Sequence, residues 1–251
     1  MAAITAILYR EGKIRATNIT FMLWDLGFPL FYLLFFGVGM TAAVGAAPGT
    51  HGLNYNAFFL AGVLGMATFV IASNSSWSFF LDRDNGIFYE MLTYPMSRAE
   101  YLLGKLLFNV FVGIVQAAIT LTLGSELLHV PVRWDLFPLL LAGIVGGTAG
   151  WFYFYAIFSL RIRRNDIFNS VNSVLFMILI FASSMFYPVD VLPRWFRDAA
   201  LANPITWEVD FLRLTSIGQG DPRRVAMEAA AFAVFAIASF LLAVRALQEQ
   251  E

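Results

Sequence analysis

Long stretches without charge limit what this chain can fold into. Residues 26–81 contain no Asp, Glu, Lys or Arg, and residues 106–125 contain none either. Several apolar runs reach the roughly 20 residues that a helix needs to cross a bilayer. Hydrophobic residues make up 59% of the chain and charged residues 13%, against about 45–50% and about 25% in soluble domains. The sequence therefore predicts an all-α integral membrane protein.

Six apolar segments predict six transmembrane helices, at about residues 21–40, 57–81, 101–123, 136–160, 167–187 and 225–244. Residues 1–20 are predicted to form an N-terminal interfacial helix, with an apolar face that Glu11 and Arg15 interrupt. Residues 21–248 then form one transmembrane domain. Polar side chains within the predicted spans mark a possible pathway, namely Asn74, Gln116, Thr120 and Asn172.

The distribution of Lys and Arg predicts the orientation. These residues gather in the N-terminal segment and in the loops at 82–105 and 161–166, whereas the loops at 41–56 and 124–135 carry Arg133 alone. Cytoplasmic loops carry an excess of Lys and Arg, so both termini are predicted to lie in the cytoplasm, with the chain in the cytoplasmic (inner) membrane. Five arginines between residues 194 and 224 favour the opposite orientation. That loop is long, and charges in long loops influence orientation less.

The loop at residues 82–105 has a defined internal order. Gly86 permits a sharp turn, residues 87–92 can form a short helix around Glu90, and Pro95 ends that helix. Ser97 and Glu100 then form a capping box that starts the next span. A solvated hairpin and a docking helix for a soluble partner both fit this order.

This loop resembles the first cytoplasmic loop of ABC-2-type transporter permeases. The matching residues are Arg83, Asp84, Gly86, Glu90, Pro95, Ser97, Arg98, Gly104 and Lys105. The resemblance implies a coupling helix that rests in a groove of an ATP-hydrolysing subunit. The ATPase-coupling residues it implies are Asp82, Arg83, Asp84, Gly86, Glu90, Pro95 and Arg98.

Residues 188–221 alternate aromatic and charged side chains, and no run there is long enough to cross a membrane. Two short interfacial or re-entrant helices, split at Asn203-Pro204, fit this pattern. Glu208 and Asp210 are interpreted as surface charges. The segment resembles the external segment of the drug-resistance and nodulation-factor branch of ABC-2 permeases, through Phe186, Pro188, Val189, Leu192, Pro193, Asn203, Pro204 and Arg213. The predicted re-entrant site, with a possible role as a lid, comprises Pro188, Pro193, Trp195, Pro204, Trp207 and Arg213.

The resemblance implies a six-helix permease that pairs with a second permease copy and with cytoplasmic ATPase subunits. No G-x-x-x-x-G-K-[ST] motif occurs in the sequence, so ATP and Mg²⁺ are expected to bind on the partner rather than on this chain. The uncharged pathway favours an amphipathic or lipidic cargo, such as a drug, a glycolipid or a lipid-linked saccharide. Small residues that predict close helix packing, within the chain or between two chains, are Gly143, Gly146, Gly147 and Gly150.

Other functions have less support in the sequence. A membrane-embedded transferase needs a nucleophile beside a base, but Asp25 and Glu126, two ionisable residues at span ends, have no neighbouring His. A proton-coupled carrier or channel usually has a charge at mid-membrane, and none is apparent. The chain has no Cys, its two His residues are far apart, and its net charge is −1. Disulfides are therefore excluded, and neither a metal site nor nucleic-acid binding is expected.

Overall fold

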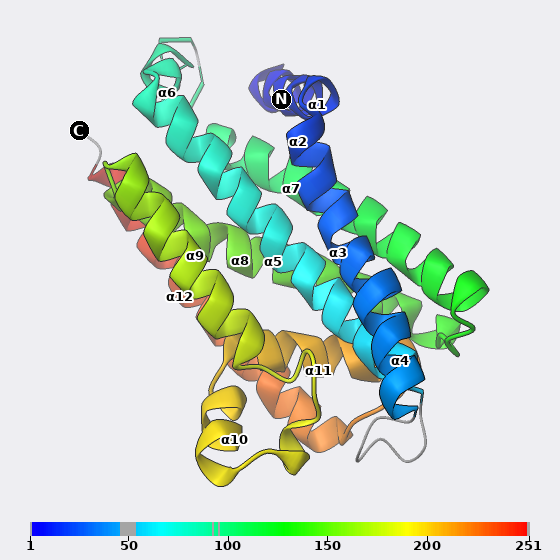
Figure 1. Ribbon diagram of the computed structural model, residues 1–251. Coiled ribbons are helices and arrows are strands. Elements are labelled where there is room, and N and C mark those ends of the chain that lie inside the picture. Colours follow the sequence, from blue (N-terminus) through cyan, green and yellow to red (C-terminus); the bar gives the residue numbers. More distant parts are fainter. Residues whose placement is uncertain (1, 46–53, 92, 95, 250–251) are drawn as a thin grey trace.

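A computed structural model describes residues 2–45, 54–91, 93–94 and 96–249, and it confirms an all-α fold (Figure 1). Asn18 ends α1 (Ala2–Thr17) and caps the next helix, accepting a hydrogen bond from the Thr20 N–H. A nearly continuous helix follows, in which α-helical and π-helical turns alternate. Its parts are α2 (Ile19–Met22), η1 (Leu23–Gly27), α3 (Phe28–Phe31), η2 (Tyr32–Gly37) and α4 (Val38–Val44).

The middle of the chain contains three long helices and one short one. They are α5 (Tyr55–Asp84), α6 (Ile87–Met91), α7 (Arg98–Thr122), which a π-helical turn η3 (Leu123–Leu127) extends, and α8 (Phe137–Arg161), which follows a 3-10 turn η4 (Trp134–Leu136). The last third contains α9 (Asn165–Phe181), a 3-10 turn η5 (Val189–Val191), α10 (Arg194–Leu201), α11 (Pro204–Ile217) and α12 (Pro222–Gln248).

Five of the described helical segments are long and apolar enough to cross a membrane. They are Ile19–Ala43, Tyr55–Asp84, Arg98–Leu127, Trp134–Arg161 and Pro222–Gln248. The remaining predicted span, the fifth at residues 167–187, corresponds to α9, which has 17 residues and a length of about 25 Å, against a hydrocarbon core of about 30 Å. The count of six spans therefore stays a prediction.

The helix α9 ends earlier than the predicted span at 167–187, because side chains from the following segment replace its hydrogen bonds. The Asn203 amide donates to the carbonyl oxygens of Leu179 and Ala182, both at 2.7 Å. The Ser184 N–H then donates to the Thr206 hydroxyl at 3.1 Å. The two bonds from Asn203 satisfy carbonyls that the end of α9 leaves open, and the chain then continues toward α10.

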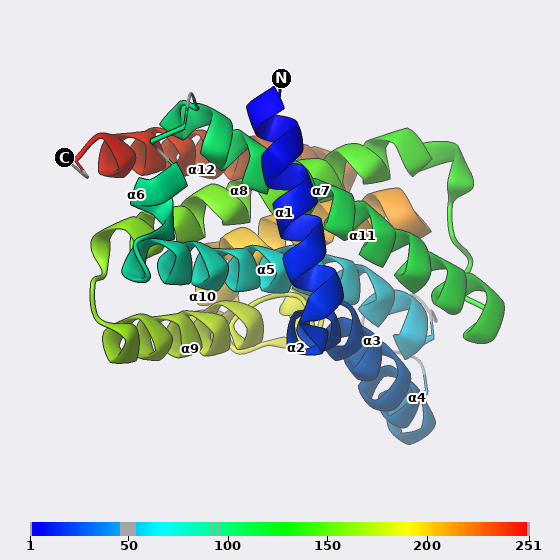
Figure 2. The ribbon, with the colours of Figure 1, turned by 90° about the horizontal axis from the view of Figure 1, so that it is seen from above.

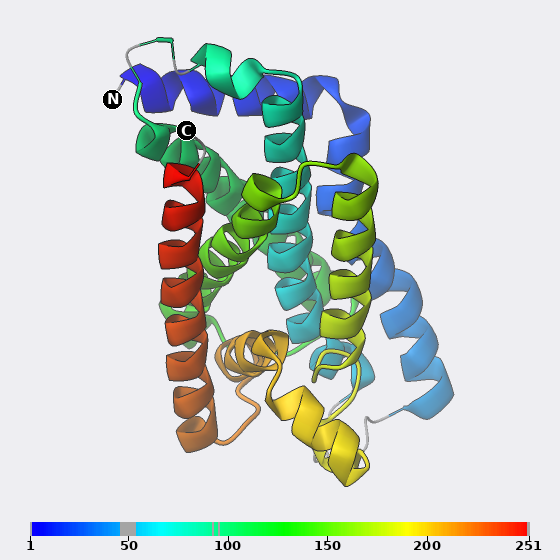
Figure 3. The ribbon, with the colours of Figure 1, turned by 90° about the vertical axis from the view of Figure 1, so that its left-hand side faces the viewer.

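The two chain ends and α6 lie at one end of the bundle, and α10 lies at the other (Figures 1 and 3). Seen from above, α1 runs across the ends of the other helices rather than along them (Figure 2). We call the end with α6 the loop end and the end with α10 the far end.

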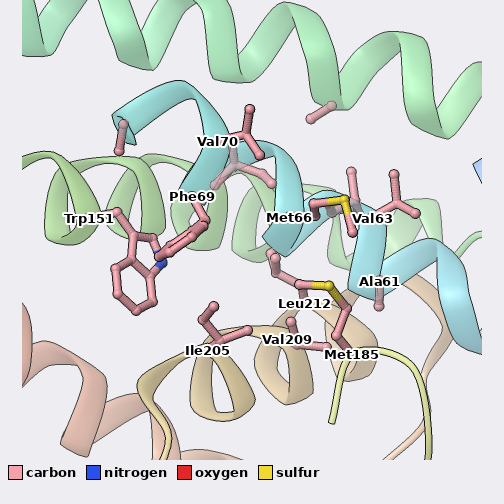
Figure 4. Close-up of a cluster of buried hydrophobic side chains, with 14 of the residues drawn as sticks. Ala61, Val63, Met66, Phe69, Val70, Trp151, Met185, Ile205, Val209 and Leu212 are labelled. Carbon is pink, nitrogen blue, oxygen red and sulfur yellow. The ribbon is translucent and has the colours of Figure 1, made fainter. Parts of the chain in front are cut away.

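The central helix is α5, whose membrane-spanning window is completely buried. It packs against α7, α8 and α11, and Figure 4 shows the apolar core that these helices share. Two glycines permit α5 to approach α11 and the segment after α9 closely. A Cβ at Gly62 would lie 2.6 Å from the Met185 carbonyl oxygen, and one at Gly65 would lie 2.6 Å from Val209 Cγ2.

Candidate coupling and substrate sites

A cluster of charged side chains is buried at the loop end, where α1 and α5 both pack on α7. Lys105 is fully buried, and its Nζ lies 2.8 Å from Glu11 Oε1 and 3.0 Å from Asp82 Oδ2. Asp82 also accepts hydrogen bonds from Arg10, at 2.5 Å, and from the Tyr101 hydroxyl, at 2.6 Å. We call these five residues the charge cluster. Its two cations and two carboxylates balance, which limits the cost of burying them.

The face of α1 that packs against the bundle carries charges. Ile7, Glu11 and Arg15 are buried and follow one another at four-residue spacing, so they lie on one side of the helix. Ile7 packs against the backbone of Gly104 on α7, and Arg15 forms an ion pair with Asp25. Glu11 and Arg15 thus interrupt the apolar face of α1 as expected, and each meets an opposite charge inside the protein.

Arg83 holds the loop to the end of α8. Its guanidinium donates to the carbonyl oxygens of Ser159, at 2.5 Å, and Leu160, at 2.7 Å, and also to that of Ile162. These carbonyls belong to the last turn of α8, where open acceptors and the helix dipole favour a cation. Asp82 and Arg83, both expected among the ATPase-coupling residues, are buried and form the base of the loop.

The tip of the loop is exposed. Asp84, Gly86 and Glu90 are all on the surface, and Gly86 has φ +74°, which requires glycine at this turn. The predicted short helix is present as α6. Of the remaining predicted coupling residues, Pro95 lies outside the described residues.

The start of α7 shows the predicted capping box. The Ser97 side chain accepts from the Glu100 N–H at 3.2 Å, and Glu100 accepts from the Ser97 N–H at 2.9 Å. The neighbouring Arg98 donates to the Leu247 carbonyl oxygen at 3.0 Å. Arg98 therefore ties the end of the loop to the end of α12.

A groove with a volume of about 680 Å³ lies between the α2–α3 segment, α5 and α9. Two of the four predicted pathway residues, Asn74 and Asn172, line it. Asn74 donates to Asp25 Oδ1 at 2.7 Å, and the Ser73 hydroxyl lies 2.9 Å from Asn172 Oδ1. The other lining residues include five aromatic side chains, Phe21, Trp24, Phe28, Trp77 and Phe176. Such a mixture of aromatic surface with a few polar groups suits an amphipathic ligand.

The other two predicted pathway residues lie elsewhere. Gln116 and Thr120 are fully buried on α7 and do not line the groove. The Gln116 amide donates to the Leu26 carbonyl oxygen at 3.4 Å. In this structure Gln116 therefore joins α7 to the first span.

The small residues of α8 pack mostly against helices of the same chain. A Cβ at Gly143 would lie 2.8 Å from Phe211, and one at Gly150 would lie 3.0 Å from Phe232. Gly147 faces α11, where a Cβ would overlap the Glu208 carboxylate. Gly146 has nothing within 4 Å, so it points away from these contacts.

Two short helices occupy the segment after α9, and they are split at Asn203-Pro204 as predicted. Pro193 precedes α10 and Pro204 begins α11, while Pro188 precedes η5. Trp195 on α10 is 73% exposed, whereas the Trp207 indole donates to the Leu201 carbonyl oxygen at 2.7 Å. The sequence does not distinguish these two tryptophans, because the break between the helices sets their orientation.

Arg213 lies inside the protein. Its guanidinium donates to Asp210, at 2.5 Å, and to the Ser184 carbonyl oxygen, at 2.8 Å, and it stands 4.0 Å from the centre of the Phe58 ring. The same side chain lines a cavity of about 670 Å³. Arg213 thus joins α11 to the segment after α9 and to α5.

Glu208 is also buried, with 3% of its surface exposed. Its Oε2 accepts from the Trp151 indole at 2.5 Å, and its Oε1 lies 2.6 Å from the Thr68 hydroxyl. Burial raises the pKa of this carboxyl to about 8. The interpretation of Glu208 as a surface charge is wrong, because α11 packs between α5, α8 and α12 and turns this side chain inward.

Comparisons with known proteins identify a family for this chain. The family model described as "ABC-2 type transporter" matches residues 2–216. A putative transport permease ycf38 of Cyanophora paradoxa is 27% identical over 74% of this chain and 64% of its own length, so the aligned part spans less than two thirds of that relative. Nodulation protein J of Rhizobium leguminosarum bv. trifolii is 25% identical over 78% of this chain and 74% of its own length.

The family match covers the first five predicted spans, the loop at 82–105 and nearly all of α11. Since the match extends over most of the chain, this protein belongs to the ABC-2 type transporter family, as a multi-pass membrane permease.

Proposed function

We propose that this chain is the permease subunit of an ATP-binding cassette exporter, driven by a separate ATPase that docks on α6. The observation that carries this proposal is the contrast within the loop at 82–105. Its tip is exposed at Asp84, Gly86 and Glu90, while its base is fixed by the buried Asp82 and Arg83. A helix that must pass on a partner's movement needs both an exposed contact surface and a rigid attachment.

The contacts of Asp82 and Arg83 determine which helices would move when the ATPase displaces α6. Asp82 connects the loop to α1 and α7 through Arg10, Tyr101 and Lys105, and Arg83 connects it to α8. These residues therefore support coupling as positioning residues rather than as contacts with the ATPase. ATP and Mg²⁺ would bind on the partner, which supplies the energy of transport.

The groove between the first span, α5 and α9 is the proposed path for an amphipathic or lipidic cargo. It is an open groove in the side of one chain, so a second permease copy facing it would complete an enclosed pathway. Oxidative cross-linking of a Trp24→Cys variant tests this arrangement, because the native chain has no Cys. Efficient dimer formation supports the second copy, and a monomeric permease that transports in the presence of its ATPase would contradict it.

Charge reversal on α6 tests the docking proposal. Glu90→Lys changes an exposed residue at the loop end, and Glu126→Lys is a matched control because Glu126 is also exposed but lies at the opposite end of α7. Both variants are purified with the cognate ATPase. We expect Glu90→Lys to reduce ATPase co-purification and permease-stimulated ATP hydrolysis by about tenfold or more, while Glu126→Lys does neither. Equal behaviour of the two variants would refute docking on α6.

A further inference from the structure

Glu208 is a buried carboxyl that the proposed transport mechanism does not use. It lies on α11, which is too short to cross the membrane, and it contacts two of the long helices. Thr68 on α5 and Trp151 on α8 both reach its carboxyl group, at the edge of the core drawn in Figure 4, in which Trp151 lies beside Phe69. Its position raises the question of how its negative charge is compensated.

The oxygen contacts around Thr68 favour a proton on the Glu208 carboxyl group. Thr68 Oγ1 lies 2.8 Å from the Gly65 carbonyl oxygen and 2.6 Å from Glu208 Oε1. The Thr68 hydroxyl has one proton for these two acceptors, so it cannot fully satisfy both. A protonated Glu208 would donate to Thr68 Oγ1 and leave the Thr68 proton for the Gly65 carbonyl oxygen, while the Trp151 indole donates to Glu208 Oε2.

The surroundings offer no compensating cation. No ion pair among the described residues involves Glu208, and the backbone of α8 at Gly147 closes against Oε1. On its own helix, Asp210 pairs with Arg213 at 2.5 Å. Charged groups also occur on the other elements that pack against α11. They are Asp82, Arg83 and Asp84 at the opposite end of α5, Asp135 on η4, Arg161 at the end of α8, Asp166 on α9, Arg194, Arg197 and Asp198 on α10, and Arg223, Arg224, Glu228 and Arg245 on α12.

We infer that Glu208 is a proton-binding site of this permease and that its protonated form holds α11 against α5 and α8. An ionised carboxylate here would lack a cation and would leave the Thr68 hydroxyl facing two acceptors. The elevated pKa given above agrees with a neutral carboxyl at pH 7.

The site also links proton binding to movement of α11. If α11 separates from α5 and α8, water reaches the carboxyl and its pKa returns toward the ordinary value of 4.5. Any state of the protein that exposes Glu208 at neutral pH would therefore release a proton. This inference stands whether or not the chain works with an ATPase, because it rests on hydrogen bonds within the chain.

Infrared difference spectroscopy of the reconstituted permease tests the inference directly. A protonated carboxyl and a carboxylate absorb at different frequencies, so the spectrum of the wild type minus that of Glu208→Gln identifies the form present. We expect a protonated-carboxyl band at pH 7 that disappears as the pH rises through about 8. A matched Glu126→Gln variant, changed at an exposed site, should retain that band. A difference spectrum that shows a carboxylate band at pH 7 would overturn the inference.

A second measurement tests for the protonated carboxyl if Glu208→Gln does not fold. Glutamate labelled with ¹³C at the carboxyl carbon shifts every glutamate band of the wild type, so a protonated glutamate can be detected without a substitution at Glu208. Trp151→Phe removes the indole donor to Oε2 and should shift that band further. Absence of any protonated glutamate in the labelled wild type at pH 7 would refute the proton site.

Discussion

Neutralising Lys105 should cost this permease much of its stability. The Lys105→Met variant keeps a side chain of similar length and apolar character, but it leaves Glu11 and Asp82 with one remaining cation, Arg10. Lys105 is completely buried, so water cannot take the place of its ion-pair partners. Removing one partner from a buried ion pair costs about 3–5 kcal/mol. At about 2–4 °C per kcal/mol for a chain of this size, the melting temperature should fall by about 6–20 °C.

The assay follows tryptophan fluorescence during thermal unfolding of the purified protein in detergent. A double variant, Lys105→Met with Asp82→Asn, separates charge balance from simple loss of packing, because it restores a cluster with one cation and one carboxylate. We expect the double variant to recover part of the lost stability, with a coupling of about 0.5–3 kcal/mol between the two sites.

Lys13→Met serves as the control, since Lys13 lies on the exposed side of the same helix as Glu11. It changes the same residue type in the same way and should alter the melting temperature little. The reasoning fails if Lys105→Met melts within about 2 °C of the wild type, or if the double variant is less stable than Lys105→Met alone.

Three further predictions follow from the far end of the bundle. Gly147→Ala should lower stability by about 1–3 kcal/mol in the same unfolding assay, because the new methyl group overlaps the Glu208 carboxyl, whereas Gly146→Ala has open space and should change it little; equal effects would contradict this packing. The wild type should lose stability as the pH rises from about 4.5 to about 8, because the carboxyl of Glu208 ionises in the unfolded chain first and in the folded chain only near pH 8; Glu208→Gln should lack this loss, and parallel pH profiles would count against it. A single cysteine at the exposed Asp198 should react with a membrane-impermeant thiol reagent added outside intact cells, and reaction only after permeabilisation would reverse the predicted orientation.

The sequence alone determined the features that depend on neighbouring residues. Long uncharged runs predicted an all-α membrane protein, because hydropathy acts over one helix length at a time. The capping box of Ser97 and Glu100, the short helix after Gly86 and the break at Asn203-Pro204 were also predictable. Each of these depends on hydrogen bonds or backbone angles within a few residues, so the local sequence contains all of the necessary information.

Only the tertiary structure decided the roles of the buried charges. Glu11 and Lys105 are far apart in sequence, as are Thr68 and Glu208, and no local pattern shows that they meet. A charged side chain near the end of a span is predicted to lie at the surface unless its partner is known. Packing of α1 on α7 and of α11 on α5 supplies those partners, and burial then turns ordinary surface charges into an anchor for the loop and a site for a proton.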